Sequence, residues 1–225
     1  ENVALGNAAL DSGSLSGGSN TAIGSSALTA NTTGVSNTAT GRVALGANVG
    51  GTDNSAFGKD ALATNVSGNF NTAIGSNALL VSTTSSNTAV GYQAGLAITT
   101  GDRNALVGAQ TGDAITTGAA NTALGYEALG ANTTANSNTA IGAYSLDANT
   151  TGGDHVAVGS NALGANTTAD SNTAVGRHAL ILNTTGTANV SLGYNALAAN
   201  TTADNNTGVG YSALQANTTG TGSTA

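Results

Sequence analysis

The stretch NTALGYEALGANTTANSNTAIGAYSLDANTTGGD, residues 121–154, contains nearly the same phrase twice, and the second copy begins 17 residues after the first. The glycine of the NTAxG phrase marks this repeat along the whole chain. It stands at Gly6, Gly24, Gly41, Gly58, Gly75, Gly91, Gly108, Gly125, Gly142, Gly159, Gly176, Gly193 and Gly210. The spacing is 17 residues except for one interval of 18 and one of 16. A period this short is typical of a β-solenoid, in which each repeat is one coil stacked on the next.

Two apolar columns recur when the Asn that opens each repeat is numbered as position 1. Position 4 is apolar in twelve of the thirteen coils, and position 9 is Leu in eleven, with Gly95 and Gly112 as the exceptions. Positions 2–4 alternate with the two-residue period of a strand, and the Gly at position 5 ends it. We therefore predict two short strands per coil, at positions 2–4 and 7–10, with position 4 (Val175) and position 9 (Leu180) pointing into the core. The predicted fold class is an all-β parallel β-solenoid, or β-roll, of about thirteen 17-residue coils forming a single elongated domain over residues 1–225.

Composition and charge exclude several classes of partner. The chain has 33 Gly, no Pro, Cys, Met or Trp, and a formal net charge of −7, with Arg42, Lys59, Arg103 and Arg177 as its cations. So acidic a chain is a poor match for phosphate backbones, and we expect no nucleic acid partner. Without cysteine there is no thiolate metal site. No apolar run reaches the roughly 18 residues of a membrane span, so we expect no membrane insertion.

The Asn column at position 1 has a structural interpretation. Asn tolerates a left-handed backbone and bonds its own turn, and identical amides stacked at the ladder spacing of ~4.8 Å can bond one another. The predicted ladder consists of Asn2, Asn20, Asn37, Asn54, Asn71, Asn87, Asn104, Asn121, Asn138, Asn172, Asn189 and Asn206, with His155 in the remaining coil. A second Asn opens the NTT corners at Asn132, Asn149, Asn166, Asn183, Asn200 and Asn217. These corners are either stacked turns or glycosylation sequons.

The repeat resembles known fibre proteins. The phrases that carry the likeness are NTAIGSSALTANTTG (20–34), SNTAVGRHALILNTTG (171–186) and NTGVGYSALQANTTG (206–220). They resemble the repeats of phage tail-fibre and related bacterial surface-fibre proteins. The shorter phrases NVALG (2–6), HVAVG (155–159) and NVSLG (189–193) are similar to the head repeats of trimeric autotransporter adhesins, whose period is shorter. Both resemblances imply a trimeric parallel β-roll used in attachment, placed outside the cell on a virion tail or a cell surface.

Assembly is also expected from the thin core. Two or three large apolar side chains per coil bury little area, and a homotrimer sharing an inner Val/Leu face buries more. Neither end of the sequence has the polar cap that normally closes a solenoid. Open ladder ends recruit further strands, so the segment is expected either to belong to a longer polypeptide or to join copies of itself end to end into a homo-oligomeric filament.

No catalytic or metal-binding constellation emerges from the sequence. His155 and His178 lie 23 residues apart, at positions 1 and 7 of neighbouring coils, which is not a ligand spacing. The acids just before position 1 are interpreted as solvated turn residues and not as a calcium site. They do not occur in every coil, and the Gly-Gly-x-Gly-x-Asp pattern is missing. These acids are Asp53, Asp102, Asp154, Asp170 and Asp204. We expect no enzyme activity, no cofactor and no metal.

The residue type at position 6, directly after the glycine, differs from coil to coil, as is typical of a contact surface. This column holds Tyr92, Tyr126, Tyr194, Tyr211, Arg42, Arg177 and Lys59. Tyr combines flat apolar area with a hydroxyl, which fits a cell-surface glycan or a protein receptor as partner. The alternative is that these side chains pack along the sheet as a cross-strand ladder.

Two functions follow from these patterns. The leading hypothesis is a structural shaft segment of a phage tail fibre or an extracellular adhesin filament, which mediates or supports attachment. The alternative is an ice-binding solenoid that presents a flat array of Thr from the NTT corners. Adjacent Thr residues of an extended chain point to opposite sides, which counts against this alternative.

Overall fold

The computed structural model describes all 225 residues and contains two compact units, Glu1–Gln110 and Thr111–Ala225. Every strand in both units has three residues. The first unit contains β1 (Val3–Leu5), β2 (Thr21–Ile23), β3 (Thr38–Thr40), β4 (Ser55–Phe57), β5 (Thr72–Ile74), β6 (Thr88–Val90) and β7 (Ala105–Val107). The second unit contains β8 (Thr122–Leu124), β9 (Thr139–Ile141), β10 (Val156–Val158), β11 (Thr173–Val175), β12 (Val190–Leu192) and β13 (Thr207–Val209).

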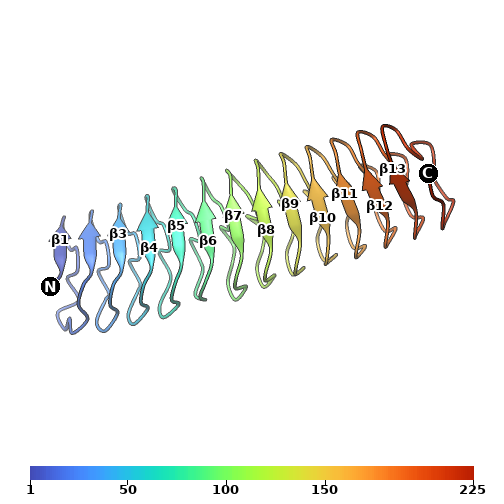
Figure 1. Cartoon of the computed structure of the whole chain (residues 1–225). Coiled ribbons are helices and arrows are strands. Elements are labelled where there is room, and N and C mark those ends of the chain that lie inside the picture. The colour runs from blue at the N-terminus through green and yellow to red at the C-terminus, as the bar shows by residue number, and fades with distance from the viewer. The chain divides into compact units, whose positions relative to one another are not determined.

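Within each unit the strands pair in parallel and in chain order, one strand per coil. Equal positions of the repeat face each other, so that Ala22 pairs with Ala39 in the first unit and Ala140 with Ala157 in the second. Figure 1 shows the arrows of β1 to β7 side by side and pointing the same way, and likewise those of β8 to β13. Each unit is therefore a parallel β-solenoid, which confirms the predicted fold class. The chain has no helix, and so none that could cross a membrane.

The second strand predicted at positions 7–10 is wrong. That segment is a turn in every coil, and the residues at positions 7 and 9 have positive φ, for example 60° at His178 and 50° at Leu180. Extended backbone requires negative φ, so the alternation of left-handed residues excludes a strand. The coils are still hydrogen-bonded here. Val43 N donates to Ser25 O of the preceding coil at 2.9 Å, and Leu45 N donates to Ala61 O of the following coil at 3.0 Å.

The core consists of the Leu at position 9 together with Ala at positions 3 and 8. Leu180, Ala174 and Ala179 are all fully buried, and the same holds for their counterparts in most coils. The prediction for position 4 is wrong, because Val175 and its equivalents point outward and are partly or largely exposed. Successive strand residues face opposite sides, so burying the small Ala at position 3 places position 4 outside. One Leu and two Ala already fill the narrow interior of a 17-residue coil.

The first unit shows how the core tolerates Gly95, which replaces Leu at position 9. A Cβ at Gly95 would lie 3.0 Å from side-chain atoms of Leu79 and Leu106 and 3.1 Å from Ile98 Cδ1. Ile98 stands at position 12 of the same coil and Leu106 at position 3 of the next one, where most coils have Asn and Ala; both are fully buried. Apolar side chains at other positions of the same and the adjacent coil therefore fill the interior that Leu would occupy.

The Gly at position 5 is required by the stacking of the coils. Its φ lies between +132° and +146° in all thirteen coils. At Gly142 a Cβ would lie 2.6 Å from Gly159 C and 2.7 Å from Gly159 O in the next coil. An L side chain fits neither this backbone conformation nor the space, so the column is invariant for a steric reason.

Candidate functional site

The outward strand face carries the most extensive exposed apolar surface of each unit. Position 4 places one large apolar side chain on nearly every rung, including Ile74 in the first unit and Leu124 in the second, which is 50% exposed. In the second unit this column consists of Leu124, Ile141, Val158, Val175, Leu192 and Val209. Soluble monomers seldom expose contiguous apolar rows of this kind, which mark interaction surfaces.

Position 2 adds a hydroxyl-rich column beside the apolar one. In the first unit the hydroxyl side chains on consecutive rungs belong to Thr21, Thr38, Ser55, Thr72 and Thr88. All five are partly or fully exposed. At the NTT corners the first Thr uses its hydroxyl within the solenoid: those of Thr133 and Thr150 donate to the carbonyl oxygens of Thr150 and Thr167 in the next coil, at 3.2 and 3.0 Å. The second Thr of these corners, such as Thr134 and Thr151, is exposed, so Thr rows lie both on the strand face and at the corners.

The Asn side chains of position 1 join each coil to its neighbours from the inside. Asn54 is representative: its backbone N–H donates to Asn37 Oδ1 at 3.0 Å, and its Nδ2 donates to the same oxygen at 3.1 Å and to Gly68 O at 2.8 Å. The amide thus bonds both the preceding coil and the corner of its own coil. Its φ is not positive; the left-handed residue is the one before it, such as Asp53 with φ of 55°. The amide hydrogen bonds, and not the tolerance of Asn for a left-handed backbone, account for the residue at position 1.

The Asn residues of the NTT corners form a second buried ladder. Asn166 Nδ2 donates to Asn149 Oδ1 at 2.9 Å, and Asn183 Nδ2 donates to Asn166 Oδ1 at 3.1 Å. Five of these Asn side chains are fully buried, those of Asn132, Asn149, Asn166, Asn183 and Asn200, and Asn217 is partly buried. A glycan would be attached through this amide nitrogen. In the five buried sequons the folded coil leaves no room for it, and the stacked-turn interpretation fits the geometry.

In the second unit the structure brings together three members of the predicted contact column. The rings of Tyr194 and Tyr211 stack with centroids 5.3 Å apart and planes inclined by 12°, and the Arg177 guanidinium lies 5.9 Å from the Tyr194 centroid. The ring of His178, which the sequence analysis did not place in this column, lies 6.3 Å from Tyr194. The faces of Tyr194 are thus engaged by its neighbours along the solenoid, as a cross-strand ladder requires.

Tyr126 belongs to a different cluster of the second unit. Its ring meets that of Tyr144 edge to face at 5.4 Å, and its hydrogen bond to Glu127 raises the pKa of Tyr126 to about 12. Burial, aided by the charge of Glu127, raises the pKa of Asp113 and of Asp147 above the ordinary 3.8. Sequence inspection missed Glu127, Asp113 and Asp147 because they stand at positions 7 and 10, where only a few of the thirteen coils have an acid.

The cations of the first unit pair with carboxylates. Arg42 Nη2 lies 2.9 and 3.1 Å from the two carboxylate oxygens of Asp60, and Lys59 Nζ lies 3.4 Å from Asp60 Oδ2. Arg103 Nη2 lies 3.2 Å from Asp102 Oδ1. Tyr92, the remaining member of the column in this unit, is 52% exposed. Surface pairs of this kind contribute little to stability and do not define a binding site.

Two of the acids before position 1, Asp170 and Asp204, accept hydrogen bonds in the turns. Asp170 Oδ1 accepts the N–H of Gly153 at 2.7 Å, and Asp204 Oδ1 accepts the N–H and hydroxyl of Thr187 at 2.7 and 3.0 Å. Asn136 does the same for Ala119 at 2.7 Å, so the role needs an acceptor and not a charge. No three His, Asp or Glu side chains lie close enough together to hold a metal ion.

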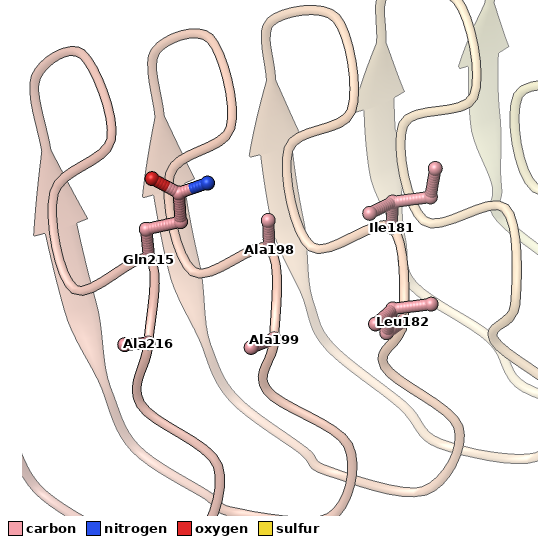
Figure 2. A pocket seen from close by; sticks show the side chains of 6 residues that line it. All are labelled: Ile181, Leu182, Ala198, Ala199, Gln215 and Ala216. Carbon is pink, nitrogen blue, oxygen red and sulfur yellow. The ribbon is translucent and has the colours of Figure 1, made fainter.

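A shallow hollow of about 430 Å³ lies over three successive turns of the second unit. Figure 2 shows its lining, Ile181, Leu182, Ala198, Ala199, Gln215 and Ala216, which occupies positions 10 and 11 of the three coils. Leu182 is 51% exposed at its edge. The hollow is open and almost purely apolar, and no charged group or nucleophile faces it. It offers hydrophobic contact area without catalytic chemistry.

Comparison of the chain with protein-family models, with curated proteins and with solved structures finds no match.

Proposed function

We propose that this chain is a shaft segment of a fibre that supports attachment, and that copies of the chain assemble side by side through their outward strand faces. The observation that carries the proposal is the position-4 column, which presents Leu, Ile or Val on every rung of the second unit and on all rungs of the first except those of Thr40 and Phe57. An apolar row with the spacing of a parallel ladder, ~4.8 Å, is matched best by a surface with the same spacing. A second copy of the chain in parallel provides such a surface.

Three copies are the proposed number. A closed threefold arrangement lets every strand face bury its apolar column, while each solenoid remains exposed on its other sides. The inward Asn ladders bind the coils of one chain to one another, so association through the outward face adds lateral support without disturbing the coil. Resemblance of the repeat to tail-fibre and adhesin-head sequences supports the same assembly. An extracellular location on a virion or a cell surface is part of this proposal.

Light scattering coupled to size-exclusion chromatography tests the assembly. The parent chain is expected to elute with the mass of three copies. A double variant, Leu124→Glu with Ile141→Glu, places charges on two adjacent rungs of the outward face and should elute as a monomer with an unchanged β-sheet circular dichroism spectrum. Thr151→Glu is the matched control, since Thr151 is exposed at a corner of the coil that contains Ile141. A parent chain that remains monomeric at high concentration would overturn the assembly.

Ice binding is a second candidate, because the strand face of the first unit carries five hydroxyl side chains on consecutive rungs. A flat row of regularly spaced hydroxyl and methyl groups suits a crystal plane, and the strand face provides such a row in addition to the exposed second Thr of the NTT corners. Measuring thermal hysteresis of the purified chain separates the two functions. Activity at micromolar concentration would favour ice binding over the fibre, and its absence together with a trimeric mass would support the fibre.

A further inference from the structure

We propose that His155 makes the second unit sensitive to mild acid, because protonation of its buried ring breaks the position-1 ladder at that coil. His155 is fully buried, like the Asn residues on the adjacent rungs. Its backbone N–H donates to Asn138 Oδ1 at 3.1 Å, as the ladder requires. It is the one rung of this ladder whose side chain titrates near neutral pH.

The ring reproduces the hydrogen bonds of an Asn only in its neutral form. Nδ1 lies 3.1 Å from the backbone N of Asn172, which can only donate, so Nδ1 must be an unprotonated acceptor. Nε2 lies 2.6 Å from the carbonyl oxygen of Ala169, which can only accept, so Nε2 carries the proton. Asn172 makes the equivalent pair of bonds: its Oδ1 accepts from Asn189 N at 2.9 Å and its Nδ2 donates to Gly186 O at 2.7 Å.

Protonation removes the acceptor on which the next coil depends. An imidazolium has N–H groups on both nitrogens, so Nδ1–H would face the N–H of Asn172 at hydrogen-bond distance. The bond between the two rungs is then lost, and two donors oppose each other between two fully buried residues. On the other side of the ring, Asn166 Nδ2 lies 3.1 Å from Nε2. This amide nitrogen is a donor, so it offers the imidazolium no acceptor.

Burial and the surroundings of the ring have opposite effects on its pKa. Burial lowers the pKa of His155 below its ordinary 6.5, whereas its hydrogen bonds with Ala169 and Asn172 and the carboxylates of Asp170 and Asp154 raise it, with burial the larger effect. A His whose pKa is lower in the folded state loses stability as pH falls below the unfolded value. Full stability is therefore present above about pH 6.5, and it decreases as pH falls from there toward the folded pKa.

Hydrogen exchange at the Asn172 amide tests the proposal, with the parent compared to His155→Asn at each pH so that the intrinsic exchange rate cancels. Asn occupies position 1 in the other twelve coils, so the variant is expected to fold with the same register. Between pH 7 and 5 the protection factor of the parent should fall relative to His155→Asn, by up to about tenfold per pH unit below 6.5. His178→Asn is the matched control and should keep the pH dependence of the parent.

A parent and a His155→Asn variant with the same pH dependence would overturn the proposal. Nitrogen NMR of the His155 ring gives a second readout that needs no variant. The spectrum at pH 7 should show an unprotonated Nδ1 and a protonated Nε2. A ring that takes up a proton while the Asn172 amide remains protected would show that the coil accommodates the cation, and the proposal would then be wrong. Both readouts are independent of whether the chain forms a fibre.

Discussion

At the scale of single residues, the repeat is a set of positions that each solve one steric or hydrogen-bonding problem. Gly at position 5 permits a backbone with φ above +130° and a contact too close for a Cβ. Asn at position 1 supplies an acceptor for the next coil and a donor for its own corner. His155 can occupy the same position because its neutral ring presents the same two groups.

Gly142→Ala tests the steric requirement at position 5. The added methyl group would meet Gly159 of the next coil at 2.6 Å, and the left-handed φ of +132° adds strain for any L side chain. We expect the free energy of unfolding to fall by about 2–4 kcal/mol. Gly130→Ala is the control, since its Cβ would meet the nearest atom at 3.4 Å and other coils have Ala at this position. Urea denaturation of both variants gives the comparison, and equal midpoints would contradict the steric argument.

At the scale of elements, each coil consists of one strand and one turn that face the interior differently. The strand turns its small residue inward and its large residue outward, while the turn contributes the Leu that fills the core. Left-handed residues at positions 7 and 9 cost of order 1 kcal/mol each for non-glycine side chains. The inter-coil hydrogen bonds and the burial of Leu in every turn offset this cost.

Leu180 and Val175 of one coil distinguish these roles. Leu180→Ala removes a fully buried side chain and leaves a cavity, and we expect a loss of about 2–5 kcal/mol. Val175→Thr changes a partly exposed position on the outward face and should cost less than about 1 kcal/mol in an isolated solenoid. Thermal or urea unfolding measures both. A large loss at Val175 in a monomeric sample would mean that position 4 belongs to the core after all.

At the scale of the whole molecule, charge is sparse, so individual carboxylates control the response to pH. The second unit has Arg177 as its single cation and contains Asp113, Glu127 and Asp147 near one another. Partial burial and the charge of Glu127 raise the pKa of Asp113 and Asp147. Their response to acid is opposite to that of His155, because the folded state binds their protons more tightly than the unfolded chain does.

Asp147→Asn is predicted to stabilise the second unit at neutral pH. A carboxyl with a raised folded pKa opposes folding when it is ionised, and this penalty disappears as pH falls through the folded pKa toward 3.8. The variant should therefore have a higher urea midpoint than the parent at pH 7 and an equal one near pH 3.5. Asp170→Asn is the control, because that side chain acts through an acceptor oxygen that Asn retains. A difference between Asp147→Asn and the parent that persists in acid would contradict the electrostatic cause.

The sequence by itself determined the period, the parallel order of the rungs, the glycine column and the burial of Leu at position 9. These features are local or strictly periodic, so one coil already contains them. The tertiary structure decided which apolar column is internal, because the interior of a narrow coil has room for Leu180 and its alanines but not also for Val175. It also decided the backbone of positions 7–10. The left-handed residues at positions 7 and 9 alternate with the residues between them, so this turn has the same two-residue period as a strand. The stacking of the Tyr rings and the two bonds of the His155 ring depend on distances between coils, which no single repeat encodes.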